Sequence, residues 1–215
     1  GVRPAGGITF YSDIEEEYGG PAGMTLMLEE GRLEGYEALV SCEPTGMEIQ
    51  IGNNGGMATA YEAAGRTAHS GLAHLGVNAV VHMARFITEY LELPYLKVEN
   101  PLFGKSTVNF EKIDGGNYLS AVPDRRRACL DTRFIPDTPP EMVRAQIAAL
   151  IDRLQREEGI TIREVTQPVD WRPPGGKFNA AAFIPPEHPF VVRVATAFRN
   201  ALGTEPVLSG CPGAT

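Results

Sequence analysis

The chain lacks the features that mark several protein classes. Its 215 residues contain no apolar run near the roughly 18 residues that a membrane-spanning helix needs. Lys and Arg total 19 against 27 Asp and Glu, and the resulting net charge of -8 argues against a nucleic-acid or membrane-surface partner. Only three cysteines are present, without a CxxC pair, which argues against a disulfide framework or a thiolate zinc site. These absences predict a globular protein of the cytoplasm with reduced thiols.

One acidic stretch stands out against this ordinary composition. Residues 13–20 hold three successive glutamates, which follow the apolar run 7–11 and precede two glycines. Acidic runs are most often solvated surface. The competing interpretation is a carboxylate cluster at the C-terminal end of a strand, where α/β folds place their chemistry. The residues of this stretch alone leave both interpretations open.

Both ends of the chain have an α/β pattern. Apolar runs predict strands at 7–11 and 37–42 around a short helix at 23–30. Near the other end, helical spacing predicts a helix over 189–202, and a short strand at 206–208 follows it.

The middle of the chain has a different pattern, of the order β-α-β-β-α-β. Strands are predicted at 57–64, 106–113, 125–134 and 160–165, with helices at 78–93 and 139–158. Thr138 is the predicted N-cap of the second helix, and Gly159 ends it. The basic run 125–127 is predicted to protect a strand edge from pairing. This order predicts a ferredoxin-like domain.

The simplest architecture is an α/β domain in two segments, interrupted by an inserted βαββαβ domain. We place the first catalytic segment at 1–55, the inserted dimerisation (lid) domain at 56–171 and the second catalytic segment at 172–215. The chain starts at Gly1 and stops in a glycine-rich loop, so we expect a piece of a longer protein.

The motifs of the chain, in their order, resemble those of the M20 metallopeptidase and deacylase family. The family includes acetylornithine deacetylase and succinyl-diaminopimelate desuccinylase. The motifs are Asp13–Gly20, Glu43-Pro44-Thr45, Gly65–Ser70, Gly76–Ala79, Asp131-Thr132-Arg133 and Ser209–Thr215. The resemblance implies an amidohydrolase that cleaves an N-acyl amino acid or small peptide. It also implies two divalent metal ions (zinc, with cobalt or manganese as alternatives) and a homodimer joined through the inserted domain.

The resemblance also implies roles for single residues. Glu16 resembles the general base, while Glu17 and Glu43 resemble metal ligands. His69 resembles a histidine that reaches the active site of the partner subunit and stabilises the oxyanion. The other three histidines are predicted to be surface or core residues.

Four further residues are candidates for substrate binding. Arg133 resembles a residue that holds a substrate carboxylate, although a plain ion pair with Asp131 is the alternative. Asn78 is either a substrate contact or a helix N-cap. Gly210 and Gly213 resemble the glycine-rich loop around the substrate. Ser120 departs from the family, since many relatives carry Asn at that position.

A larger departure concerns the metal site. The family's His-x-Asp motif, bridging Asp and late His do not occur in the chain, so we expect this chain alone to be inactive. Whether it binds metal by itself is left open. Two other functions stay open as well: a non-catalytic dimerisation or ligand-binding module, and a hydrolase of carbamoyl or hydantoin-like substrates.

Overall fold

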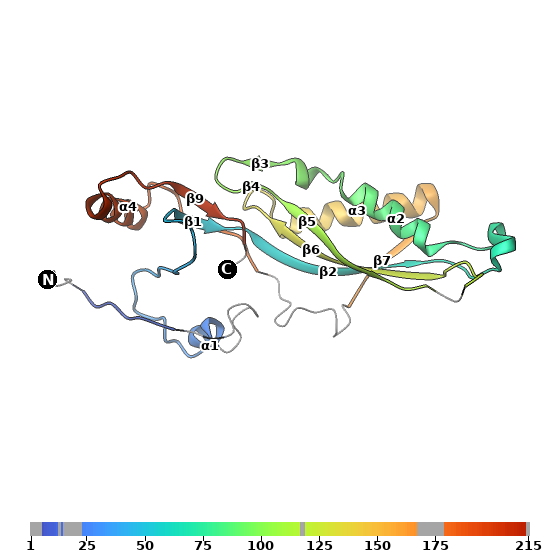
Figure 1. Ribbon diagram of the computed structural model, residues 1–215, viewed down its shortest axis with the longest axis horizontal. Helices are drawn as coiled ribbons and strands as arrows, with labels where there is room; N and C mark the ends of the chain where they lie inside the picture. Colours follow the sequence, from blue (N-terminus) through green and yellow to red (C-terminus); the bar gives the residue numbers. More distant parts are fainter. Residues whose placement is uncertain (1–5, 13, 15–22, 117–118, 167–178, 214–215) are drawn as a thin grey trace. The chain divides into compact units, whose positions relative to one another are not determined.

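The computed structural model describes residues 6–12, 14, 23–116, 119–166 and 179–213 (Figure 1). The chain forms two compact units; within the described residues, the first ends at Ser41 and the second begins at Cys42. In the described part of the chain, no helix is long and apolar enough to cross a membrane.

The first unit contains one short helix, α1 (Met24–Glu29). The strands predicted at 7–11 and 37–42 are wrong, because neither run is a strand in the structure. An apolar run becomes a strand only where a second strand satisfies its backbone groups. The described residues of this unit supply no such partner, and Phe10 and Val40 stay exposed.

The second unit contains a small three-stranded sheet in the order β8-β1-β9. Its strands are β1 (Ile49–Asn53), β8 (Ala182–Phe183) and β9 (Leu208–Cys211), and helix α4 (Pro189–Leu202) connects β8 to β9. The helix has the predicted bounds because His188 caps its start and Gly203, at φ 70°, ends it. Strand β9 starts two residues after the predicted strand.

The larger sheet has the order β5-β6-β2-β7, with every neighbouring pair antiparallel. Together with its two helices it confirms the predicted ferredoxin-like arrangement. The main elements are β2 (Gly55–Ala64), α2 (Ala79–Tyr90), β5 (Thr107–Asp114), β6 (Arg125–Phe134), α3 (Pro140–Glu158) and β7 (Thr161–Val165). Short elements join them: η2 (Ser70–Leu75), η3 (Pro94–Lys97), β3 (Glu99–Asn100) and β4 (Gly104–Lys105).

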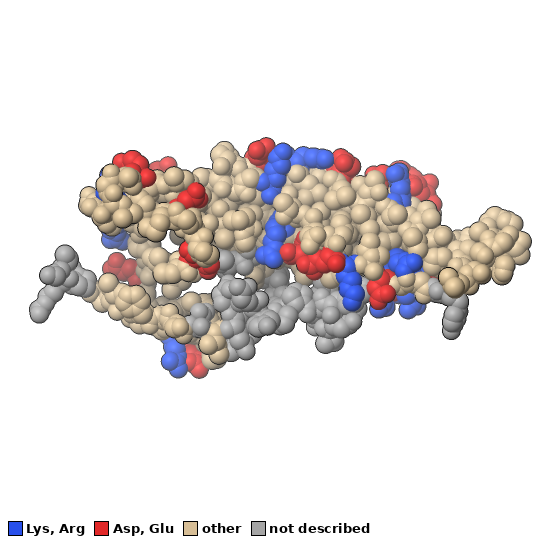
Figure 2. All heavy atoms as spheres, in the orientation of Figure 1, with Lys and Arg blue, Asp and Glu red and all other residues tan. Residues whose placement is uncertain are grey.

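The hydrophobic core lies between this sheet and the helices α2 and α3, which cover one of its faces (Figure 1). Alternate residues of the strands and every third or fourth residue of the helices point into it. The largest core side chains are Tyr61, Tyr90, Tyr95, Phe86, Phe134, Met83 and Leu130. On the outside, charges of both signs lie interspersed (Figure 2), and the ion pairs Arg85–Glu158 (3.0 Å) and Arg153–Glu89 (2.7 Å) link the two helices.

The start of α3 differs from the prediction by one residue. Pro139, in place of Thr138, is the N-cap, and its side chain makes no capping hydrogen bond. Thr138 is fully buried instead: its hydroxyl lies 2.6 Å from that of Ser106 and donates to the carbonyl of Ile135. The predicted end is correct, since Gly159 adopts the left-handed conformation at φ 67°.

Glu62 is a buried acid on the sheet face that α2 and α3 do not cover. It lies on β2 between the core residues Tyr61 and Ala63, so alternation directs it to the opposite face, where it is only 2% exposed. Its cross-strand neighbours are Arg127 on β6 and Arg163 on β7. Arg127 Nε donates to Glu62 Oε2 at 2.8 Å, and Arg163 Nη2 donates to Oε1 at 2.5 Å.

The arginines decide the charge state of Glu62. Burial alone would raise the pKa of this carboxyl, but the hydrogen bonds from Arg163 and Arg127, with the charge of Arg125, lower it below its ordinary value of 4.5. The prediction that the run 125–127 guards a strand edge is therefore wrong. Strand β6 lies inside the sheet, and Arg125 and Arg127 surround Glu62.

The ring of Phe103 packs where the small sheet meets the larger domain. A Cβ on Gly210 would lie 2.2 Å from the ring, and one on Gly52 would lie 2.8 Å from it. The Gly210 amide also donates to the Leu102 carbonyl at 3.1 Å, and Phe183 meets the ring edge-on with the ring centres 5.7 Å apart. The two glycines thus allow the backbones of β1 and β9 to approach Phe103 closely.

The carboxylate of Glu62 should contribute strongly to stability. We expect Glu62→Gln to lower the free energy of unfolding by about 1–3 kcal/mol at pH 7, because three guanidinium groups lose their shared counter-charge. Their partial exposure keeps the loss below that of a fully buried pair. Urea titrations of the chain measure this loss. The matched control is Glu164→Gln on the neighbouring strand β7, where the pair with Arg144 is long at 3.7 Å and half exposed; we expect a loss of about 0.5 kcal/mol or less.

The same pair of proteins gives a pH test. Since the folded-state pKa of Glu62 is lowered, its contribution is present above the unfolded-state pKa and is lost as the pH falls through the folded-state pKa. The difference between wild type and Glu62→Gln should therefore shrink below about pH 4.5. Equal losses for Glu62→Gln and Glu164→Gln at pH 7 would contradict the role given to Glu62.

The two candidate loop glycines should respond differently to an added methyl group. Gly210→Ala should destabilise the chain by about 1–3 kcal/mol, because its Cβ overlaps the Phe103 ring. Gly213→Ala is the control, since its Cβ would meet only Cys211 Sγ at 3.5 Å, an ordinary contact distance. Thermal unfolding of both variants measures the difference. A Gly210→Ala variant as stable as Gly213→Ala would show that Phe103 does not hold β9.

Candidate active site

Apart from Glu43, the predicted site residues in the second unit fall into two groups at opposite ends of β2. The hinge end is the region around Asn54, where β1 passes directly into β2 and the Asn54 amide donates to the Cys211 carbonyl at 2.9 Å. The tip is the region beyond Ala64: the loop 65–70, η2 and the described part of the β5–β6 connection, 119–124.

Backbone hydrogen bonds between three chain segments hold the tip together. Arg66 and Val77 exchange both of their backbone bonds, at 2.8 and 2.9 Å. The Val122 amide donates to the Ala68 carbonyl, and the Ser70 amide donates to the Ser120 carbonyl, each at 2.8 Å. Ser120 has a φ of 66°, a conformation that Asn adopts more readily than Ser.

His69 is an exposed residue that this framework fixes at the backbone. It forms a β-bridge with Ala121 and is the N-cap of η2, with φ -63° and ψ 139°. Its Nδ1 accepts a hydrogen bond from the Gly71 amide at 3.1 Å. The ring is thereby attached to the start of η2 through one nitrogen, and the other nitrogen lies on the opposite side of the ring.

Asn78 is also at the tip, at the start of α2. Its Oδ1 accepts hydrogen bonds from the backbone amides of Val80 (2.9 Å) and Val81 (3.4 Å), so this oxygen caps the helix as the alternative prediction stated. A ligand contact would fall to the amide nitrogen of the side chain. Substrate binding by Asn78 stays a prediction.

Arg133 lies at the hinge end, opposite Gly56 in the β2–β6 register. Its Nε donates to Asp131 Oδ2 at 2.8 Å, which is the ion pair considered as the alternative. A second carboxyl, that of Glu111, lies near this pair. Burial, and after it the negative charge of Asp131, raises the pKa of Glu111. The Arg133 side chain is 38% exposed, and its two Nη groups are the donors suited to a ligand carboxylate. This role also stays a prediction.

The glycine-rich loop shares the hinge end with Arg133. Asn53 pairs with Cys211, and Gly55, two residues along, pairs with Phe134 next to Arg133. Gly210 therefore lies near the end of β9, and Gly213 lies on the chain that leaves β9 at this end. Sequence reasoning missed Phe103, whose ring requires a glycine at 210 for packing alone.

The predicted metal and base residues are not brought together in the described residues. Glu43 is exposed and precedes β1, while Glu16 and Glu17 lie outside the described ranges. Among the residues that the structure describes, no three His, Cys, Asp or Glu side chains are grouped to hold a metal ion. A carboxylate such as Glu43 suits zinc, but one donor does not make a centre. The assignments of Glu16, Glu17 and Glu43 stay predictions.

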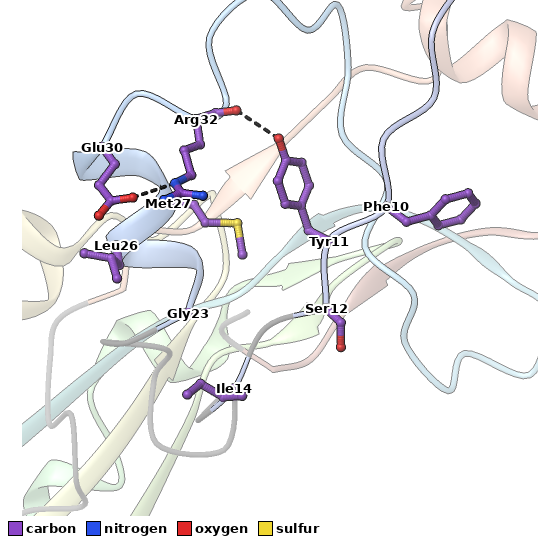
Figure 3. Close-up of a pocket in the computed structure, with 9 residues that line it drawn as sticks. All are labelled: Phe10, Tyr11, Ser12, Ile14, Gly23, Leu26, Met27, Glu30 and Arg32. Carbon is purple, nitrogen blue, oxygen red and sulfur yellow. Dashed lines mark hydrogen bonds and ion pairs between the residues drawn. The ribbon is translucent and has the colours of Figure 1, made fainter.

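A hollow on the first unit contains none of the predicted site residues (Figure 3). It is formed by Phe10, Tyr11, Ser12, Ile14, Gly23, Leu26, Met27, Glu30 and Arg32. Its polar groups contact each other: the Tyr11 hydroxyl donates to the Arg32 carbonyl at 3.0 Å, and Arg32 Nε donates to Glu30. We assign it no chemistry.

The distance between the two ends of β2 limits what one chain can do. Gly56, opposite Arg133, and Ala64, at the tip, are eight residues apart in one continuous strand. At about 3.3 Å per residue the ends are about 26 Å apart. His69 and Arg133 of one chain therefore cannot contact the same small molecule.

Comparison with known proteins agrees with this architecture. Residues 51–159 match the family described as the peptidase dimerisation domain of the M20 peptidases. The chain is 28% identical over 218 residues to the succinyl-diaminopimelate desuccinylase of Paracoccus denitrificans, covering 98% of this chain and 54% of that protein. It is 32% identical over 145 residues to the "probable carboxypeptidase" of Aspergillus clavatus, covering 65% of this chain and 35% of that protein.

A solved structure shows the same fold. The aminopeptidase PepT of Bacillus cereus matches with a TM-score of 0.57 at 20% identity, over 79% of this chain and 41% of that one. The chain thus spans about a third to a half of the length of these proteins. Because the family match covers half of the chain and lies on the βαββαβ domain, the chain belongs to the M20 peptidase family and carries its dimerisation domain.

Proposed function

We propose that this chain is the dimerising and substrate-holding part of a metal-dependent amidohydrolase, which cleaves the amide bond of an N-acyl amino acid or small peptide. The match of residues 51–159 to the peptidase dimerisation domain carries the proposal. A desuccinylase and a carboxypeptidase among the relatives, by their names, support a carboxylate-bearing amide as the substrate class.

Arg133 is the residue that we propose for the substrate carboxylate. It lies at the hinge end beside the glycine-rich loop and uses Nε for Asp131. That bond orients the guanidinium and leaves the fork of Nη donors as the group that fits a carboxylate in a bidentate way. Asp131 is then the residue that positions Arg133.

A homodimer follows from the separation of Arg133 and His69. If His69 acts on the substrate that Arg133 holds, the two residues must come from different chains, because they lie at opposite ends of β2, which are about 26 Å apart. The dimerisation domain is the natural contact between the two copies. Each site would then combine Arg133 of one protomer with His69 of its partner, and Asn78, also at the tip, would reach the same site.

The metal ions belong to the proposal as well. A pair of divalent cations, when bound, polarises the scissile carbonyl and activates water. Glu17 and Glu43 would be ligands and Glu16 the general base that takes the proton from water, with the remaining ligands supplied by the rest of the protein. We also propose a cytoplasmic location, which is supported by Cys42, Cys129 and Cys211 forming no disulfide with one another in the described residues.

Mixing two inactive variants tests the shared site. In the full-length gene product that carries this chain, we expect His69→Ala and Arg133→Ala each to lower kcat/KM by about 100-fold or more on N-acetyl or N-succinyl amino acids. When the two variants are mixed and allowed to exchange subunits, half of the dimers are mixed, and each mixed dimer has one intact site. Activity should therefore recover to about a quarter of wild type.

Two controls and two outcomes complete the experiment. His74→Ala, also in η2, and Arg144→Ala, on the outer side of α3, should keep wild-type activity. Recovery of activity in the mixture supports the shared site. A mixture as inactive as its components overturns it, and a wild-type protein that hydrolyses none of these amides overturns the amidohydrolase proposal in favour of a non-catalytic dimerisation module.

A further inference from the structure

A hairpin turn at residues 100–104 connects β3 to β4 and lies against the small sheet. Asn100 is opposite Gly104 in the β3–β4 register, and Pro101-Leu102-Phe103 stands between them. A proline in the second position and a closing glycine with positive φ, here 69° at Gly104, are typical of a three-residue hairpin turn. The turn thus has a strong local signal in the sequence.

Asn100 holds this turn with both polar atoms of its side chain. Its Oδ1 accepts hydrogen bonds from the backbone amides of Leu102 (2.8 Å) and Phe103 (3.2 Å), as in an Asx-turn. Its Nδ2 donates to Asp137 Oδ2 at 2.8 Å. Asp137 lies in the connection from β6 to α3, four positions after Arg133. One side chain therefore shapes the turn and also attaches it to the end of β6.

The turn contacts the small sheet through the same two residues whose amides Asn100 binds. The Leu102 carbonyl accepts a hydrogen bond from the Gly210 amide at 3.1 Å. The Phe103 ring occupies the space that side chains on Gly52 and Gly210 would need. The position of β9 at Gly210 therefore depends on the conformation of the turn.

We infer that Asn100 is a positioning residue, which fixes the glycine-rich loop after β9 relative to Arg133 on β6. The backbone from β1 into β2 is one link between these two parts of the hinge end. The hydrogen bonds of Asp137, Asn100 and Gly210 form a second link, at a separate point. Two separate links restrict a rotation that one backbone connection allows. That the two parts hold one substrate rests on the proposed function.

The hydrogen bond from the Gly210 amide to the Leu102 carbonyl can be measured in the folded chain without a substrate. Nuclear magnetic resonance detects it as a coupling between the amide 15N and the carbonyl 13C, which weakens steeply as the bond lengthens. We expect Asn100→Ala to lower this coupling to about half or less, because the Leu102 carbonyl is no longer held in place. Couplings across the β2–β6 ladder should keep their values.

The matched control is Asn200→Ala, since Asn200 is an exposed residue of α4. We expect it to leave the coupling at Gly210 at its wild-type value. An unchanged coupling at Gly210 in Asn100→Ala overturns the inference, and so does an equal loss across the β2–β6 ladder, which would mean a general loosening of the fold.

Reversing the bond between positions 100 and 137 tests the anchor of the turn. Asn100→Asp keeps an acceptor for the two turn amides but places two carboxylates together, so the coupling at Gly210 should weaken. Adding Asp137→Asn supplies a donor again, and the double variant should recover a coupling near the wild-type value. A double variant that stays as weak as Asn100→Asp overturns the role given to Asp137.

Kinetics of the full-length gene product separate positioning from stability. We expect Asn100→Ala to raise KM for N-acetyl or N-succinyl amino acids by about tenfold, with kcat changed by less than about threefold, because binding must first order a loosened site. The reversed double variant should return KM to near its wild-type value, and Asn200→Ala should not change it. A fall in kcat at unchanged KM overturns the positioning role.

The two kinds of measurement fail independently. If the wild-type protein hydrolyses none of these amides, the proposed function fails, while the coupling at Gly210 still decides whether Asn100 fixes the loop.

Discussion

Ten consecutive cross-strand pairs between β2 and β6 are the constraint on which the rest of this structure depends. They make β2 a continuous connection from the hinge end to the tip, and strand geometry then sets the length of that connection. Arg133 is tied to one end by its pairing with Gly56, and the loop that carries His69 starts at the other. The sheet therefore works as a spacer, and any chemistry that needs both residues must involve a second copy of the chain.

The spacer is stabilised differently on its two faces. On one face, α2 and α3 bury a continuous apolar core. On the other, Glu62 lies among Arg125, Arg127 and Arg163, and its lowered pKa keeps it ionised at neutral pH. The hydrogen bonds of this buried carboxylate form only when β6, β2 and β7 are paired in the observed register. Glu62 therefore helps to fix the alignment of the three strands on the uncovered face. A shift by one residue would place Tyr61 among the arginines.

The inserted domain could be predicted closely from the sequence because its signals are local. Strand β6 and helix α4 have the predicted bounds, since alternation or helical spacing continues up to a clear stop such as Gly203. The runs 7–11 and 37–42 have equally strong apolar signals, yet a strand also needs a neighbour, and sequence spacing says nothing about its presence. Thr138 was misplaced for a related reason, since its hydroxyl serves the buried Ser106 instead of the helix start.

The candidate site was predictable in residue type but not in arrangement. Sequence reasoning selected His69, Asn78, Arg133 and the loop glycines, but it could not tell that they separate into two groups, because that depends on which end of a strand each follows. It also could not see that Gly210 is required by the Phe103 ring, a contact 107 residues away in the sequence.

The capping bonds of the tip connect its folding to its chemistry. Each capping side chain accepts the backbone hydrogen bond with one of its two polar atoms: Asn78 caps α2 with Oδ1, and His69 caps η2 with Nδ1. The second polar atom makes no part of the cap. In both side chains the remaining atom is a nitrogen that carries hydrogen. The acceptor atoms are thus used to hold the backbone in place, and the donor atoms are left for the ligand that the proposed function assigns to the tip. A surface of this kind favours an oxygen atom that gains negative charge, which is the electrostatic requirement of amide hydrolysis.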